Sequence, residues 1–162
     1  MHLNTDDSLP PNSSFSWSRL LQQAEGLMSV SSHRLANAAN LSALLYMEVP
    51  DISWAGFYFL QGDKLWLGPF QGKPACVEIE MGKGVCGSAA ARRETLLVKD
   101  VNAFEGHIAC DAESQSEVVV PLVKHGEVIG VLDIDSTSLG RFSKEDAAAL
   151  TQLAEIYLSS VD

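Results

Sequence analysis

The chain has 162 residues, of which 46% are hydrophobic and 20% charged, and its formal net charge at pH 7 is −10. This length and composition are typical of one globular domain that buries a core without disulfide or metal staples. The negative charge argues against binding to nucleic acid or to an anionic membrane, and no apolar run approaches the ~20 residues that cross a bilayer. The N-terminus has no secretory signal pattern, so we expect a cytoplasmic protein.

The N-terminal third is expected to be helical after a short lead. Residues 1–15 are rich in Ser, Asn, Asp and Pro, which predicts a flexible segment, and residues 16–162 form the single predicted domain. Apolar residues recur at helical spacing over 17–28 behind Ser16 as N-cap, which predicts an amphipathic helix. A second helix is predicted over about 32–48, closed by Pro50.

The middle of the chain changes to strand patterning. Residues 54–60 and 64–70, joined by a turn around Gly62, predict an antiparallel hairpin, and 75–80 predict a third strand. Small residues over 84–91 predict a short helix before a brief strand at 95–98. Cys86 lies near the start of this helix, where the helix dipole is expected to lower the pKa of its thiol.

The C-terminal third contains a long irregular segment, a hairpin and a last helix. Residues 99–116 have no regular pattern, and loops of this length are usually functional. A hairpin is predicted over 117–123 and 127–135 around His125 and Gly126, and a helix behind Ser143. The element order predicts an α+β fold, an antiparallel sheet with helices packed outside it. The apolar stripes of the first and last helices could form a homodimer interface, although we favour covering of the domain's own sheet.

Three cysteines stand at positions 76, 86 and 110. An odd number of thiols in a reducing compartment favours catalytic or redox-cycling cysteines over structural disulfides. Cys110 lies in a polar run over 106–111, which favours a reactive thiol. The alternative is that the three are ordinary buried thiols.

Two acids lie close together in the last predicted hairpin. Asp133 and Asp135 point to the same face of their strand, where they could hold an ammonium group or a cation. Alternatively, the strand ends there and Asp135 meets water. A two-residue turn would pair Val118 with Asp133 and send Glu117 to the opposite face. The exceptions would be a bulge near Glu117, or a Glu117 that lies outside the ladder and turns back over the sheet edge.

Other candidate groups in the sequence are an aromatic residue and the histidines. Trp54, on the first predicted strand, is either a core residue or the apolar wall of a ligand site. No resident metal is expected, because the four histidines lie at no ligand spacing and no Cys-x-x-Cys pair exists. No other cofactor is expected.

Three segments carry a resemblance to a known family. GKGVCG at 82–87, GHIACDAESQSEVVVPL at 106–122 and VIGVLDIDS at 128–136 resemble the free methionine-(R)-sulfoxide reductases, single-domain enzymes with a GAF fold. The resemblance implies that Cys110 is the attacking thiol and that Cys86 and Cys76 are candidate resolving thiols. It also implies that the substrate contacts are Trp54, Glu117, Asp133 and Asp135.

The activity implied by the resemblance is thiol-dependent reduction of free L-methionine (R)-sulfoxide to L-methionine. The reaction would pass through a sulfenic acid on Cys110 and an intramolecular disulfide that thioredoxin opens. Which of Cys76 and Cys86 resolves the sulfenic acid, and which carboxyl donates the proton, stay open. The alternatives are a non-catalytic GAF-type module that senses a small molecule or redox state, and a thiol-based scaffold.

Overall fold

The computed structural model describes residues 15–108, 110 and 112–162, so the flexible segment predicted for the N-terminus lies almost wholly outside the described residues. Phe15 packs against the edge of the core, with its ring 5.0 Å from that of Trp17. In the described part of the chain, none of the helices is long and apolar enough to cross a membrane.

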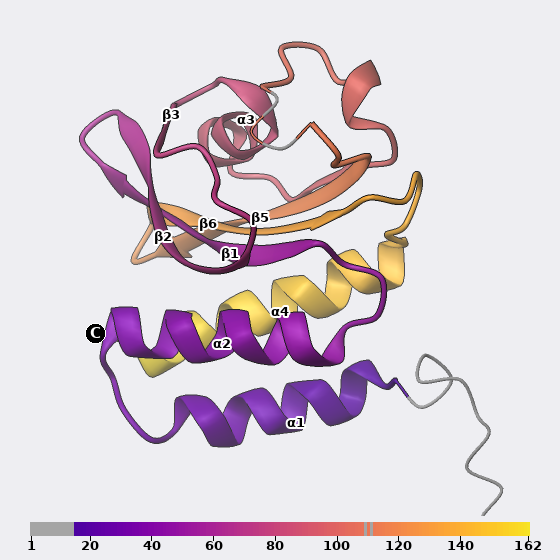
Figure 1. The fold of residues 1–162 in the computed structure, drawn as a ribbon. Helices are drawn as coiled ribbons and strands as arrows, with labels where there is room; N and C mark the ends of the chain where they lie inside the picture. Colours follow the sequence, from indigo (N-terminus) through magenta and orange to yellow (C-terminus); the bar gives the residue numbers. More distant parts are fainter. Residues whose placement is uncertain (1–14, 109, 111) are drawn as a thin grey trace, which may run out of the picture.

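Three helices lie on one face of an antiparallel sheet (Figure 1). They are α1 (Trp17–Met28), α2 (Arg34–Glu48) and α4 (Lys144–Ser160). The Ser16 hydroxyl accepts a hydrogen bond from Arg19 N at the start of α1, and Ser143 and Asp146 form a capping box at the start of α4. The predicted helices and caps are thus confirmed.

The sheet has the strand order β3-β2-β1-β6-β5-β4, with all neighbours antiparallel. Both predicted hairpins are confirmed, but the third strand begins only at Glu78. The segment before Glu78 is held by a side chain, because the Cys76 carbonyl accepts a hydrogen bond from the Tyr58 hydroxyl. The strands are β1 (Trp54–Gln61), β2 (Lys64–Gly72), β3 (Glu78–Glu80), β4 (Leu96–Val98), β5 (Ser116–Lys124) and β6 (Glu127–Ser136).

The opposite face of the sheet carries the predicted short helix α3 (Gly84–Arg92) and the long segment before β5 (Figure 1). That segment contains one turn of 3-10 helix, η2 (Val101–Ala103). The two faces of the sheet are therefore covered differently, by long helices on one side and by α3 with loops on the other.

A bulge sets the register of the β5–β6 hairpin. The turn at His125 and Gly126 has two residues in the left-handed region, with φ of 52° and 78°. Pairing then shifts between Leu122 and Val123, which leaves Ile129 as an extra residue in β6. As a result Glu117 pairs with Asp135 rather than lying on the opposite face.

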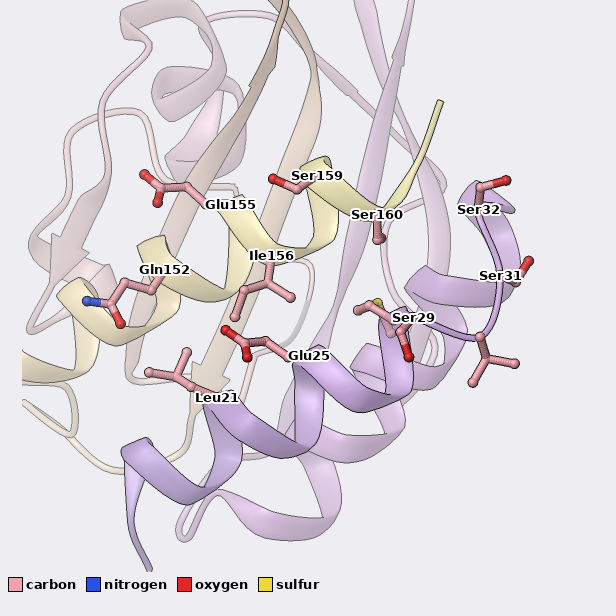
Figure 2. Close-up of a pocket in the computed structure, with 12 residues that line it drawn as sticks. Leu21, Glu25, Ser29, Ser31, Ser32, Gln152, Glu155, Ile156, Ser159 and Ser160 are labelled. Atoms are coloured by element: carbon pink, nitrogen blue, oxygen red, sulfur yellow. The ribbon is translucent and has the colours of Figure 1, made fainter.

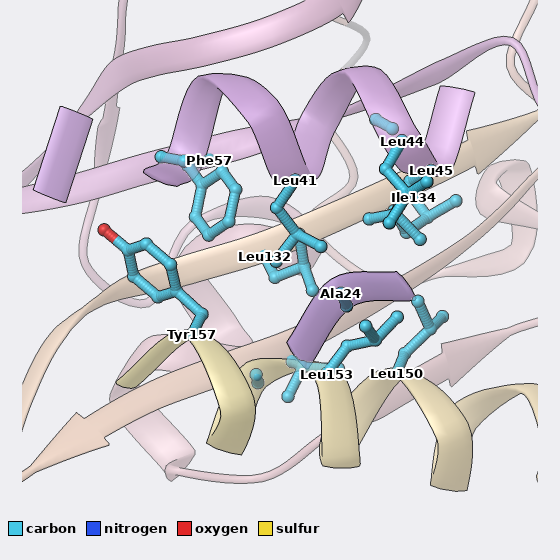
Figure 3. Close-up of a cluster of buried hydrophobic side chains, with 14 of the residues drawn as sticks. Ala24, Leu41, Leu44, Leu45, Phe57, Leu132, Ile134, Leu150, Leu153 and Tyr157 are labelled. Atoms are coloured by element: carbon cyan, nitrogen blue, oxygen red, sulfur yellow. The ribbon is translucent and has the colours of Figure 1, made fainter. Parts of the chain in front are cut away.

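The larger hydrophobic core lies between the sheet and the three long helices (Figure 3). The predicted apolar stripe of α4 faces the sheet, whereas that of α1 covers α2 and α4 from outside. The α1 residues Leu20, Ala24 and Met28 are at most 2% exposed within the single chain. These stripes therefore serve the domain itself, and a homodimer stays a prediction. The core includes Ala24, Leu41, Leu44, Leu45, Phe57, Leu132, Ile134, Leu150, Leu153 and Tyr157.

Candidate active site

The three acids named from the sequence lie on one face of the sheet, the face that carries α3. Across β1, β6 and β5 the register places Trp54, Asp135 and Glu117 in one row. Asp133 lies in the next row, opposite Gly56 of β1. Because residues two apart share a face, the register brings all three carboxyl groups together beside the Trp54 ring.

Glycine at position 56, which pairs with Asp133, leaves room for two aromatic side chains. A Cβ there would lie 2.3 Å from Phe70 Cβ and 2.9 Å from the Trp54 ring. The absence of a side chain therefore lets the rings of Trp54 and Phe70 stack, at 5.2 Å between centroids. This packing fixes Trp54, which is 3% exposed, as one wall of the site.

Cys86 reaches the acids from the first turn of α3. A Cβ at Gly87 would lie 2.4 Å from the Glu80 carbonyl oxygen, so glycine permits α3 to approach the end of β3. The Cys86 thiol lies 3.9 Å from Glu117 Oε2. Burial, with Asp133 and Glu117 nearby, raises the pKa of Cys86 well above its ordinary value. The expectation that the helix dipole lowers this pKa is wrong, because desolvation and carboxyl charges act more strongly here.

Cys76 and Cys110 form a disulfide, with their Cα atoms 5.2 Å apart, and Cys86 is free. Two side chains of the site hold the segment that carries Cys76. Tyr58 donates to the Cys76 carbonyl at 2.9 Å, and Trp54 Nε1 donates to the Lys73 carbonyl at 3.1 Å. The aromatic residues on β1 therefore anchor the disulfide over the acids.

Burial perturbs the acids strongly. It raises the pKa of Asp133 well above its ordinary value, with the Asp135 carboxyl adding to the effect. Burial and the neighbouring Asp133 likewise raise the pKa of Glu117. Asp133 is 4% exposed, whereas Glu117 keeps more of its surface open. Such carboxyl groups hold a proton at pH values where an exposed acid is ionised, so they can act as proton donors.

One pocket brings nearly all of the predicted site residues together. Its volume is about 50 Å³ with the disulfide closed. Cys76 does not line it but reaches it through the bond to Cys110. A wider hollow of about 850 Å³ lies between α1 and α4 on the far side of the sheet, and none of the predicted residues lines it (Figure 2). The pocket is lined by the predicted residues Trp54, Cys86, Cys110, Glu117, Asp133 and Asp135.

Tyr58 and Ser114 are among the pocket residues that were missed from the sequence. Tyr58 lies four residues after Trp54, so strand alternation puts both on the same face, a signal that was present. Ser114 is 9% exposed, and its hydroxyl has no hydrogen-bond partner within the described part of the chain. Its place in an irregular segment gave no periodic signal.

Three groups in this pocket could hold a metal ion. One ligand atom each from Cys86, Glu117 and Asp133 lie within 4.8 Å of one another. A thiol and two carboxyls with this spacing come from three separate elements, α3, β5 and β6, so the sequence search for local ligand spacing did not find them.

Comparison with known proteins identifies the family of this chain. The GAF domain family matches residues 18–157. A free methionine-R-sulfoxide reductase of Escherichia coli (strain K12) is 58% identical over 127 residues, 78% of this chain and 77% of that protein. The chain belongs to the free methionine-R-sulfoxide reductase family, within the GAF domains.

Solved structures of the free methionine-R-sulfoxide reductase family have the same fold. The fRMsr of Staphylococcus aureus in its reduced form superposes with a TM-score of 0.89 at 46% identity, covering 91% of this chain and 96% of that chain. The enzyme of Neisseria meningitidis, solved in complex with its substrate, gives a TM-score of 0.87 at 41% identity, over 90% and 92% of the two chains.

Proposed function

We propose that this protein is an oxidoreductase that reduces free L-methionine (R)-sulfoxide to L-methionine with thiol electrons. The observation that carries the proposal is the Cys76–Cys110 disulfide beside a pocket of buried carboxyl groups and an aromatic wall. The membership of the free methionine-R-sulfoxide reductase family supports the same substrate.

The pocket offers a partner for each part of the substrate. Asp133 and Asp135 are assigned to the ammonium group, and the Trp54 ring to the methyl group. The buried Ser114 hydroxyl and the basic side chains of Lys73 and Lys83 also line the pocket, so we assign these donors to the substrate carboxylate. A site that pairs with both charged ends of an amino acid would refuse a methionine inside a protein chain.

The first chemical step uses two pocket residues, a nucleophile and a proton donor. Cys110, as thiolate, attacks the sulfoxide sulfur while a carboxylic acid protonates the oxygen. We assign the proton to Glu117, because its pKa is raised by burial and it is less enclosed than Asp133. The oxygen then moves to Cys110 as a sulfenic acid and methionine is released.

Cys76 is assigned as the resolving thiol. Its sulfur attacks the Cys110 sulfenic acid, water leaves, and the disulfide forms. The Cys76–Cys110 bond supports this choice over Cys86, which is 5% exposed and lies against Glu117. A dithiol protein of thioredoxin type then reopens the disulfide by exchange, in the reducing environment of the cytoplasm.

The closed disulfide also implies an order of events. A cavity of about 50 Å³ holds water molecules or an ion but is too small for an amino acid. Reduction of the disulfide must therefore precede substrate entry, with the segments around Cys76 and Cys110 moving apart. The oxidised protein is a product state that waits for its reductant.

The decisive experiment supplies each sulfoxide epimer of free methionine with dithiothreitol and measures methionine. We expect product from the (R) epimer, little from the (S) epimer, and none from Cys110→Ser. Absence of product from the (R) epimer would contradict the proposal and favour a GAF-type sensor, which would bind a small molecule without turnover.

A further inference from the structure

We infer that the pocket of the oxidised protein is also a binding site for one thiophilic divalent cation, with Zn²⁺ as the physiological candidate. The ligands are the Cys86 thiolate and the carboxylates of Glu117 and Asp133, whose ligand atoms lie within 4.8 Å of one another. The inference concerns a ligand class other than the proposed substrate.

The spacing of the ligand atoms fits the coordination geometry of such a cation. Zn–S bonds of about 2.3 Å and Zn–O bonds of about 2.1 Å at tetrahedral angles place sulfur and oxygen about 3.6 Å apart. The Cys86 Sγ to Glu117 Oε2 distance is 3.9 Å without a metal ion. Small side-chain movements would complete the site, and water in the pocket would supply the fourth ligand.

A second observation points to a missing ligand at this place. The Oδ1 atom of Asp133 is buried and has no hydrogen-bond partner among the described residues. Cys86 and Asp133 are 5% and 4% exposed, so a polar atom here that has no partner is costly. A cation would give the orphaned oxygen a bond and would neutralise part of the buried acid cluster.

The donor set selects the class of cation. One thiolate and two carboxylates combine a soft sulfur ligand with hard oxygen ligands. This donor set suits Zn²⁺ or Cd²⁺ and disfavours Mg²⁺ and Ca²⁺, which prefer oxygen ligands alone. Binding requires the Cys86 thiol and the protonated carboxyl groups of Glu117 and Asp133 to release their protons to solvent. The volume of about 50 Å³ accepts an ion and its water.

The consequence for activity rests on the proposed function. Asp133 is assigned there to the substrate ammonium and Glu117 to proton donation, so a bound cation would occupy both groups. Cation and substrate would then exclude each other, and a loaded oxidised protein would need to lose its metal before it could work again.

The test uses the oxidised protein, because Cys86 is then the free thiol while Cys76 and Cys110 are bonded to each other. Cd²⁺ is added to this form and the thiolate-to-metal charge-transfer absorption is recorded in the ultraviolet. We expect the band to saturate at one Cd²⁺ per chain and to be displaced by Zn²⁺. Cys86→Ser should abolish the band, and Asp133→Asn should weaken Cd²⁺ affinity at least tenfold.

The control is Glu94→Gln, which removes an exposed carboxyl outside the pocket and should leave Cd²⁺ affinity unchanged. Absence of the band, its persistence in Cys86→Ser, or equal affinity in Asp133→Asn and Glu94→Gln would each overturn the inference. The readout needs no turnover, so its failure is distinguishable from failure of the reductase assay. Asp133→Asn keeps the test decisive if Cys86→Ser does not fold.

Discussion

Replacing the buried Asp133 by asparagine should change how the stability of the protein depends on pH. In the folded protein, burial and the neighbouring Asp135 raise the pKa of Asp133, whereas the unfolded chain has an ordinary carboxyl there. Between these two pKa values the folded state binds one more proton than the unfolded state. The free energy of unfolding therefore falls as pH rises through this window.

The magnitude follows from the proton count. One retained proton gives a slope of about 1.4 kcal/mol per pH unit within this window. Asp133→Asn removes this term, and it also lowers the pKa of Glu117, which Asp133 raises. Relative to the variant, the wild-type protein should thus lose about 1.4 kcal/mol of stability per pH unit within that window.

The measurement is urea unfolding of the oxidised protein at pH 5, 6 and 7 and at constant ionic strength. The difference between wild type and Asp133→Asn is the quantity of interest, because ionisable groups outside the pocket contribute equally to both. Glu94→Gln, at an exposed position, is the matched control and should follow the wild type. Parallel curves for wild type and Asp133→Asn would refute the claim that burial of this carboxyl dominates its ionisation.

Three further outcomes are expected. Cys76→Ser should lose multiple turnover with thioredoxin but still release about one methionine per chain in a single-turnover assay. Cys86→Ser should keep its thioredoxin-supported turnover. Equal losses of turnover in both variants would contradict the assignment of Cys76 as the resolving thiol. Gly130→Ala places a Cβ 2.2 Å from the Tyr58 carbonyl oxygen and should destabilise by about 1–3 kcal/mol in urea unfolding, while Gly26→Ala, with open space in α1, should stabilise by about 0.5–1 kcal/mol. Ser114→Ala should raise KM for methionine (R)-sulfoxide about tenfold with little change in kcat, and an unchanged KM would remove Ser114 from the substrate site.

The elements of this fold were largely predictable because their signals are local. Ser16 and Ser143 carry N-cap signatures that the structure confirms, and the His125-Gly126 turn marks the second hairpin. The spacing of apolar residues distinguishes the helical segments of this chain from its strands. The third strand was overestimated because its alternation continues through residues that instead lead to the disulfide.

The face on which Glu117 lies was not predictable from the turn. Counting residue pairs outward from a two-residue turn places Val118 opposite Asp133. The extra residue Ile129 in β6 shifts the register by one, so that Glu117 pairs with Asp135. The same bulge puts Ile129 with the core on the helix side while Val131 faces α3. A bulge leaves no clear mark in the sequence, because it depends on how neighbouring strands pack.

The environment of Cys86 was misjudged for a related reason. Its place at a helix start is a local feature, whereas the carboxyl groups that surround it come from β5 and β6. The disulfide partner of Cys110 was also left open, since spacing among three cysteines does not specify which two meet. Local patterns singled out the cysteines, Asp133 and Asp135, whereas Glu117 was named through the family resemblance, and the mutual effects of these residues required the tertiary structure.

The Cys76–Cys110 bond links positions 34 residues apart in the sequence. Closing a loop of this length restricts the unfolded chain and adds about 4 kcal/mol of stability in the chain-entropy picture. Each catalytic cycle would therefore alternate between a more stable oxidised protein and a less stable reduced protein that is ready to react. Proteolytic lifetime in the cell would then report on the supply of reductant, with degradation falling most heavily on the active form.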